Sequence, residues 1–146
     1  MTAEIVIPST NIYRNKENGT YLVQELVSSP LGGSVECGEP VTVEESEFDS
    51  RIAKLVFDAL SNYENREDNL KLEHRFRNDR QSLAFAKQHL LVNVAKIPGD
   101  RIRVAALQRK GGSFVGGVVD GETVLDHASA RQELTRALRD AFGKAR

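Results

Sequence analysis

Apolar residues between positions 46 and 63 recur with the spacing of an α-helix. They fall at offsets 0, 4, 7, 8, 11, 12 and 15 and comprise Phe48, Ile52, Leu55, Val56, Ala59, Leu60 and Tyr63. This one-sided stripe predicts an amphipathic helix covering a hydrophobic core. Ser46, with Asp49 three residues later, is typical of a helix N-cap with an acidic first turn. We therefore expect a central helix from Ser46 to Tyr63.

The segments before this helix have the character of β-strands. Residues 4–7 are β-prone and are stopped by Pro8, which predicts that residues 11–14 continue as an edge strand. Residues 21–27 predict a strand with Tyr21 and Val23 on one face. The Asn-Gly pair at 18–19 predicts a hairpin between these segments. Residues 28–40 read as a loop, and residues 41–43 as a brief strand.

The second half of the chain predicts two further helices and a β-meander. Residues 64–80 are crowded with charge and fit either a strand or a helix. The stripe of Leu83, Ala86, Leu90, Val94 and Ile97 predicts a helix over residues 79–95, although LLVNV at 90–94 also fits a strand. Residues 101–109, 113–119 and 123–125 predict a meander, with the second hairpin at Asp120-Gly121.

The last helix is predicted from both its start and its apolar stripe. Ser129 and Gln132 have the spacing of a capping box, and Gly143 is placed to end the helix. Its stripe comprises Leu134, Ala137, Leu138, Ala141 and Phe142. Helices separated by antiparallel hairpins indicate an α+β fold. We expect one domain over residues 1–146, with an N-terminal hairpin, a C-terminal meander and about three helices packed on one face of the sheet.

Composition places the chain among ordinary globular proteins. Its 146 residues are 40% hydrophobic and 28% charged. No apolar run approaches the ~20 residues needed to span a bilayer, and the first ten residues lack the pattern of a secretion signal. The single cysteine, Cys37, cannot form an internal disulfide. These features predict a cytoplasmic protein.

The net charge of −1 hides an uneven distribution. Residues 1–50 contain 2 basic and 9 acidic side chains, whereas residues 51–146 contain 18 basic and 12 acidic ones. The acidity is concentrated in a segment without Lys or Arg, which we call the acidic strip: Glu36, Glu39, Glu44, Glu45, Glu47 and Asp49. Acids near a helix N-terminus are favoured by the dipole, but Glu36 and Glu39 lie in the preceding loop. The strip therefore predicts a surface for a basic partner.

No set of residues has the spacing of a catalytic or metal site. His74, His89 and His127 match no zinc signature, so we expect neither a metal nor a cofactor. Cys37 or Ser34 with His127 would lack an orienting third group. The glycines of residues 110–117 lie between strands, where turns and bulges explain them better than phosphate binding. The basic residues of 66–80 alternate with acids, which cancel most of the positive field that nucleic-acid binding requires, so we do not expect nucleic acid as a partner.

A family resemblance rests on three parts of the chain: EFDSRIAKLVFDALSNYE at 47–64, the charged linker and second helix after it, and RIRVAALQRKGGSFVGGVVDGETVL at 101–125. The chain resembles the immunity proteins of bacterial polymorphic toxins, particularly those of contact-dependent growth inhibition systems. The resemblance implies a small cytoplasmic α+β protein without enzymatic activity, which binds the toxin domain encoded beside it and blocks that domain's active site.

Three hypotheses follow. In the first, an immunity protein neutralises a basic toxin, which the charge of the strip indicates to be a nuclease, with the acidic strip in its substrate cleft and Leu31 and Val35 as apolar anchors. In the second, a small enzyme or ligand-binding domain has a pocket between sheet and helices, with Asp126 and His127 converging on it. In the third, the chain is a structural subunit that oligomerises through its sheet edge.

Overall fold

The protein is built on one antiparallel sheet with three helices. The computed structural model describes residues 7–28, 34–65, 79–111 and 113–146. The elements in chain order are β1 (Ser9–Asn15), β2 (Tyr21–Ser28), β3 (Ser34–Glu36), β4 (Val41–Val43), the 3₁₀ turn η1 (Glu45–Glu47), α1 (Phe48–Asn65), α2 (Asp79–Gln88), β5 (His89–Ile97), β6 (Arg101–Lys110), β7 (Ser113–Asp126) and α3 (His127–Lys144). The strand order is β3-β2-β1-β5-β6-β7, with β4 also paired to β2. The α+β fold predicted from the sequence is confirmed.

The N-terminal hairpin is formed by β1 and β2. At its turn, the Asn15 side chain accepts hydrogen bonds from the backbone of Glu17 and Asn18, and Gly19 takes a φ of 74°. The prediction of an edge strand is wrong, because β1 pairs with β2 on one side and with β5 on the other. Pro8 lies just before the first paired residue, so its missing N–H removes nothing from the ladder.

Half of the predicted second helix is a strand. The helix α2 ends at Gln88, and residues 89–97 form β5 between β1 and β6. Val92 and Val94 are buried on one face of β5, while Leu91 and Ala95 are buried on the other. Because apolar side chains are buried on both faces, and Asn93 alone is polar among residues 90–95, the segment fits a buried strand as well as a helical stripe, and its pattern does not decide between them.

The Asp-Gly pair at 120–121 does not form a hairpin. Strand β7 continues through it from residue 113 to residue 126 along β6. Its pairing moves from Glu122 opposite Ala105 to Gly117 opposite Leu107, so residues 118–121 lie opposite Ala106 alone. The additional residues form a bulge-like irregularity within β7. A turn signal in the sequence is the same for such an irregularity and for a hairpin, so the Asp-Gly pair alone could not tell them apart.

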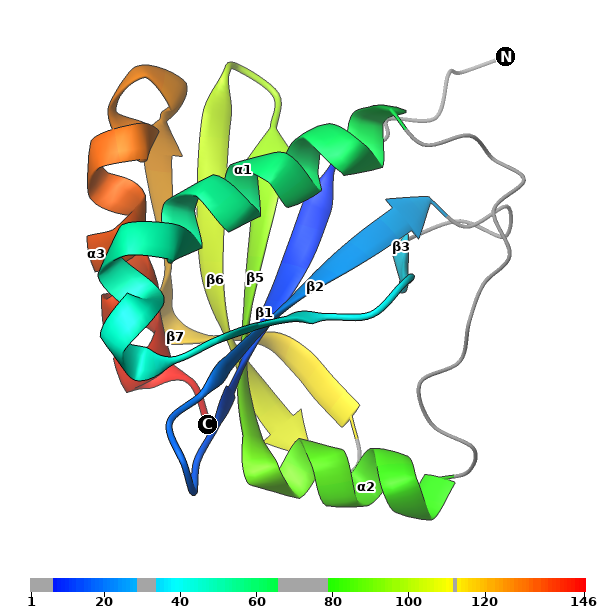
Figure 1. Ribbon diagram of the computed structural model, residues 1–146. Helices are drawn as coiled ribbons and strands as arrows, with labels where there is room; N and C mark the ends of the chain where they lie inside the picture. The colour runs from blue at the N-terminus through cyan, green and yellow to red at the C-terminus, as the bar shows by residue number, and fades with distance from the viewer. Residues whose placement is uncertain (1–6, 29–33, 66–78, 112) are drawn as a thin grey trace.

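The helices cover the two faces of the sheet unequally. Helix α1 crosses one face with α3 beside it, while α2 lies apart from both (Figure 1). Ile12 of β1 belongs to the core under α1 and α3, whereas the next side chain, Tyr13, points to the opposite face. There its ring packs edge-on against that of Phe85 on α2, with the ring centroids 4.9 Å apart. The expectation that all helices lie on one face is therefore wrong for α2.

The apolar stripes of α1 and α3 fill the main core as predicted. All the stripe residues of α1 are buried except Leu55, which is partly buried, and all five of α3 are buried. The helix starts differ from the predicted ones. The turn before α1 is capped by Glu44, not Ser46. Asp126 occupies the N-cap position of α3 without a capping hydrogen bond from its side chain, so that Ser129 lies inside the helix and donates to the Asp126 carbonyl.

Candidate functional site

The structure divides the acidic strip between the two faces of the sheet. Glu36 ends β3, whose register places it opposite Leu26 of β2. The phenol of Tyr13 donates a hydrogen bond to the Glu36 carboxylate, and Asn11 Nδ2 donates to the same oxygen at 3.3 Å. Asn93 Nδ2 in turn donates to Asn11 Oδ1 at 3.0 Å. Glu36 is thus half-buried on the face opposite α1 and α3, and its carboxylate is held by β1.

Two other carboxylates of the strip bind an arginine that the sequence analysis did not single out. Arg139 of α3 donates from Nη1 to Glu45 Oε1 and from Nε to Asp49 Oδ1, each at 2.9 Å. Its guanidinium lies 4.5 Å from the centre of the Phe48 ring. We call this arrangement the Arg139 clamp. Because it joins the start of α1 to α3, it fixes the region from which the strip projects.

Two ionisable groups at the clamp, Glu45 and Tyr21, have shifted pKa values. The hydrogen bond from Arg139 lowers the pKa of Glu45 below that of an ordinary glutamate. Burial, followed by the hydrogen bond to Glu45, raises the pKa of the Tyr21 phenol. Both shifts stabilise the charge state found at neutral pH: an ionised Glu45 and a neutral Tyr21.

The remaining acids of the strip are not bound by Arg139. Glu47 pairs with Arg51 one helical turn away at 3.1 Å. Glu39 and Glu44 are exposed and make no ion pair with the residues that the structure describes. Six carboxylates and two bound guanidinium groups leave the strip with a charge of −4. The net negative charge of the strip is therefore smaller than the sequence suggests, and two of its four charges belong to Glu39 and Glu44.

Replacing Arg139 by glutamine is expected to lower the free energy of unfolding at pH 7 by about 1 kcal/mol, since the clamp is partly exposed and screened. The pKa of Glu45 is depressed in the folded state, so its contribution is present above the usual value of 4.5 and is lost as the pH falls through the folded pKa. The difference from the wild type should therefore narrow in acid, down to the part due to the Phe48 contact. Urea denaturation of the two proteins at a series of pH values measures this difference in the free energy of unfolding.

Arg136→Gln, an exposed change on the same helix, is the control and should show neither the loss of stability nor its pH dependence. A pH-independent difference for Arg139→Gln would contradict the link between the clamp and the pKa of Glu45.

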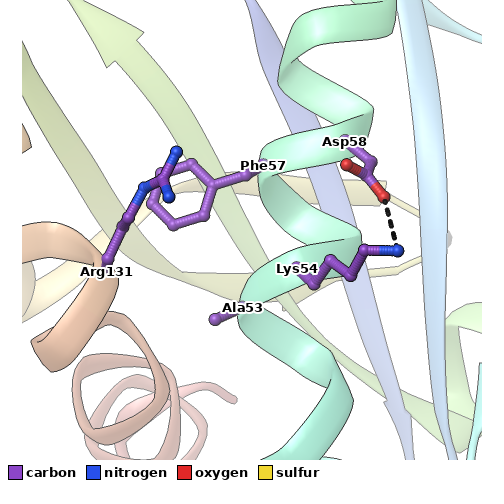
Figure 2. Close-up of a pocket in the computed structure, with 5 residues that line it drawn as sticks. All are labelled: Ala53, Lys54, Phe57, Asp58 and Arg131. Atoms are coloured by element: carbon purple, nitrogen blue, oxygen red, sulfur yellow. Dashed lines mark ion pairs between the residues drawn. The ribbon is translucent and has the colours of Figure 1, made fainter.

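A second candidate site is a cavity between α1 and α3. It has a volume of about 390 Å³ and is lined by Ala53, Lys54, Phe57, Asp58 and Arg131. Figure 2 shows Arg131 reaching from α3 across the ring of Phe57 on α1. The Arg131 guanidinium lies 5.8 Å from the centre of that ring, and the His127 ring packs edge-on to it with centroids 6.3 Å apart. The sequence analysis placed a pocket between sheet and helices; this one lies between two helices, with His127 at its edge.

The other candidate groups have structural surroundings. Cys37 is buried, with its thiol directed to the Glu25 carbonyl, and burial raises its pKa. The Ser34 hydroxyl hydrogen-bonds that of Tyr63 at 2.8 Å, and His89 Nδ1 bonds the Phe85 carbonyl at 2.8 Å. Gly111 has a φ of 62° at the β6–β7 turn, which explains a glycine there. His74 lies outside the described residues.

The described part of the chain contains neither a metal-binding cluster nor a helix that could cross a membrane. No group of three or more His, Cys, Asp or Glu residues there has the geometry to hold a metal ion. None of the helices in that part is both long and apolar enough to cross a membrane.

The fold is shared with solved structures of very different sequence. No family model matches this chain, and no curated protein matches its sequence. A protein of unknown function from Neisseria meningitidis has the same fold, with a TM-score of 0.70 and 14% identity over 100% of both chains. A chain of the CdiA-CT/CdiI toxin and immunity complex from Yersinia pseudotuberculosis superimposes with a TM-score of 0.65 and 14% identity, covering 97% of this chain and 99% of that one. At this identity, the likeness establishes a common fold.

Proposed function

We propose that this chain is an immunity protein that binds a bacterial toxin domain and blocks its active site. The observation that carries the proposal is its fold likeness, over almost the whole length of both chains, to a chain of a toxin and immunity complex. An inhibitor of this kind acts by occupying a surface and needs no catalytic residues of its own. The action is assigned to the cytoplasm, where a toxin that has entered the cell would meet its inhibitor.

The contact surface in this proposal is the exposed part of the acidic strip. The Arg139 clamp fixes the first turn of α1, so Glu44, which lies just before that turn, projects from an ordered segment. Glu39 lies on the other side of β4, next to Gly38, whose carbonyl accepts a hydrogen bond from Gln24 Nε2 at 3.1 Å. A basic cleft, such as that of a nuclease, would attract these carboxylates at long range. The bound carboxylates would then occupy the positions that the phosphates of the substrate take. Val35 is half-buried beside the strip and is a candidate anchor; Leu31, the other predicted anchor, lies outside the described residues.

The test is neutralisation of the candidate toxin in living cells. The domain encoded beside this chain is expressed from an inducible promoter in a bacterial host, with and without this protein. We expect the toxin to stop growth when expressed alone and growth to be restored when this protein is present. The purified proteins should also co-elute as a stable complex. A toxin domain of unrelated sequence serves as the control and should remain toxic. Continued toxicity of the neighbouring domain, in cells that contain soluble immunity candidate, would refute the proposal.

A further inference from the structure

The cavity between α1 and α3 combines an apolar surface with the guanidinium of Arg131. Ala53 and Phe57 supply apolar surface from α1, and Arg131 faces them from α3 (Figure 2). Its volume of about 390 Å³ falls at the lower end of the roughly 300–1,000 Å³ common for small-molecule sites. A ligand with one aromatic ring and one charged group is of the right size for such a site.

The lining carries a net positive charge that comes from Arg131. Lys54 and Asp58 lie on the same side of α1 and pair with each other at 3.9 Å, so their charges cancel. Arg131 makes no ion pair within the described part of the chain, and the residues three and four positions away on α3 are His127, Ala128, Leu134 and Thr135, none of them acidic. Arg131 is therefore a cation at the cavity whose counter-charge is not supplied by its own helix.

The position of the guanidinium suits it to bind an anion. Its central carbon lies 5.8 Å from the centre of the Phe57 ring, and its N–H groups donate no hydrogen bond to the residues that the structure describes. A carboxylate matches the N–H edge of a guanidinium with two parallel hydrogen bonds. The His127 ring supports Phe57 from another side, and its Nδ1 is buried without a hydrogen-bond partner among the described residues.

We propose that this cavity binds a carboxylate carried on an aromatic or apolar body. The carboxylate pairs with Arg131 while the apolar body packs on Phe57 and Ala53. This site is separate from the acidic strip and has the opposite charge, and the inference does not depend on the immunity function. The same chemistry is offered by a free aromatic acid and by a glutamate beside an aromatic residue in a polypeptide.

Titration with benzoate, followed by amide chemical shifts, tests the proposal. We expect saturable shifts centred on residues 53–58 and 127–131, and weaker binding of the uncharged benzamide. Arg131→Gln removes the charge and should weaken benzoate binding by about tenfold, in line with the loss of a charge-assisted bidentate pair. Arg136→Gln is the matched control, since Arg136 is exposed on the same helix and does not line the cavity. An unchanged spectrum of each free variant establishes that the fold is retained.

A capped peptide containing adjacent Glu and Phe distinguishes the two sources. Tighter binding of the peptide than of benzoate assigns the site to a polypeptide, and the reverse assigns it to a free acid; either supports the shared chemistry. The proposal is overturned by an absence of shifts up to the solubility limit of both probes. It is also overturned if benzamide binds as well as benzoate, or if Arg136→Gln weakens binding as much as Arg131→Gln.

Discussion

Replacing Phe48 by alanine is expected to lower the free energy of unfolding by about 3–5 kcal/mol, the range of fully buried aromatic truncations. Phe48 is 0% exposed and is the first residue of α1. Its ring lies 4.3 Å from that of Tyr21 on β2, and the Arg139 guanidinium covers it at 4.5 Å. The substitution therefore opens a cavity where α1, α3 and the sheet meet. The chain has no tryptophan, so urea denaturation followed by far-ultraviolet circular dichroism is the suitable measurement.

Phe57→Ala on the same helix is the matched control. Phe57 is only partly buried, beside the open cavity, so its truncation removes less contact and leaves less enclosed space. We expect less than half the loss caused by Phe48→Ala. An equal loss in the free energy of unfolding for the two variants would show that the packing around Phe48 contributes no more to stability than the packing around Phe57.

The features that the sequence predicted correctly are those decided by short stretches of chain. The stripe from Phe48 to Tyr63 gives the central helix because one amphipathic face suffices to specify it. The Asn-Gly turn gives the first hairpin for the same reason, since its backbone geometry is local. The α+β class followed from combining such elements.

The features that the sequence did not predict depend on distant partners. Leu90–Val94 fits both helical and strand periods, and pairing with β1 and β6 decides between them. Asp120-Gly121 is drawn into β7 because residues on both sides of it continue to pair with β6. Local patterns carry no information on which of these long-range pairings will form.

The same limit applies to the candidate site. Counting charges identified a strip of six acids, but the partners that neutralise or turn them lie elsewhere in the chain. Arg139 is 90 residues from Asp49 and 94 from Glu45, and Asn11 is 25 residues from Glu36. The Arg131–Phe57 cavity likewise joins two helices that are distant in sequence. Surface charge can thus be predicted from composition, whereas its availability to a partner requires the fold.

Reversing the charges of Glu39 and Glu44 together is expected to slow association with the proposed toxin partner by about tenfold at low salt. These two carboxylates are exposed and are not committed to ion pairs in the described structure, unlike Glu45, Glu47 and Asp49. Replacing them by lysine therefore changes the field of the strip. Because Glu44 also caps the turn before α1, Glu39→Lys alone, which leaves that cap and the Arg139 clamp in place, should show part of the same slowing. Because steering acts at long range and is screened by salt, the variant's association rate should also depend less on ionic strength. Stopped-flow or surface-plasmon measurements over a salt series give both quantities.

The matched control is Glu122→Lys with Glu133→Lys, which makes the same change in net charge at exposed positions on β7 and α3. If the strip faces the toxin, the control should keep most of the wild-type association rate, because steering depends on where the charges lie as well as on their sum. Equal slowing by the two double variants would mean that only net charge matters and would remove the strip from the interface. Unchanged kinetics in both would leave the proposed immunity function standing and would assign the contact to another surface.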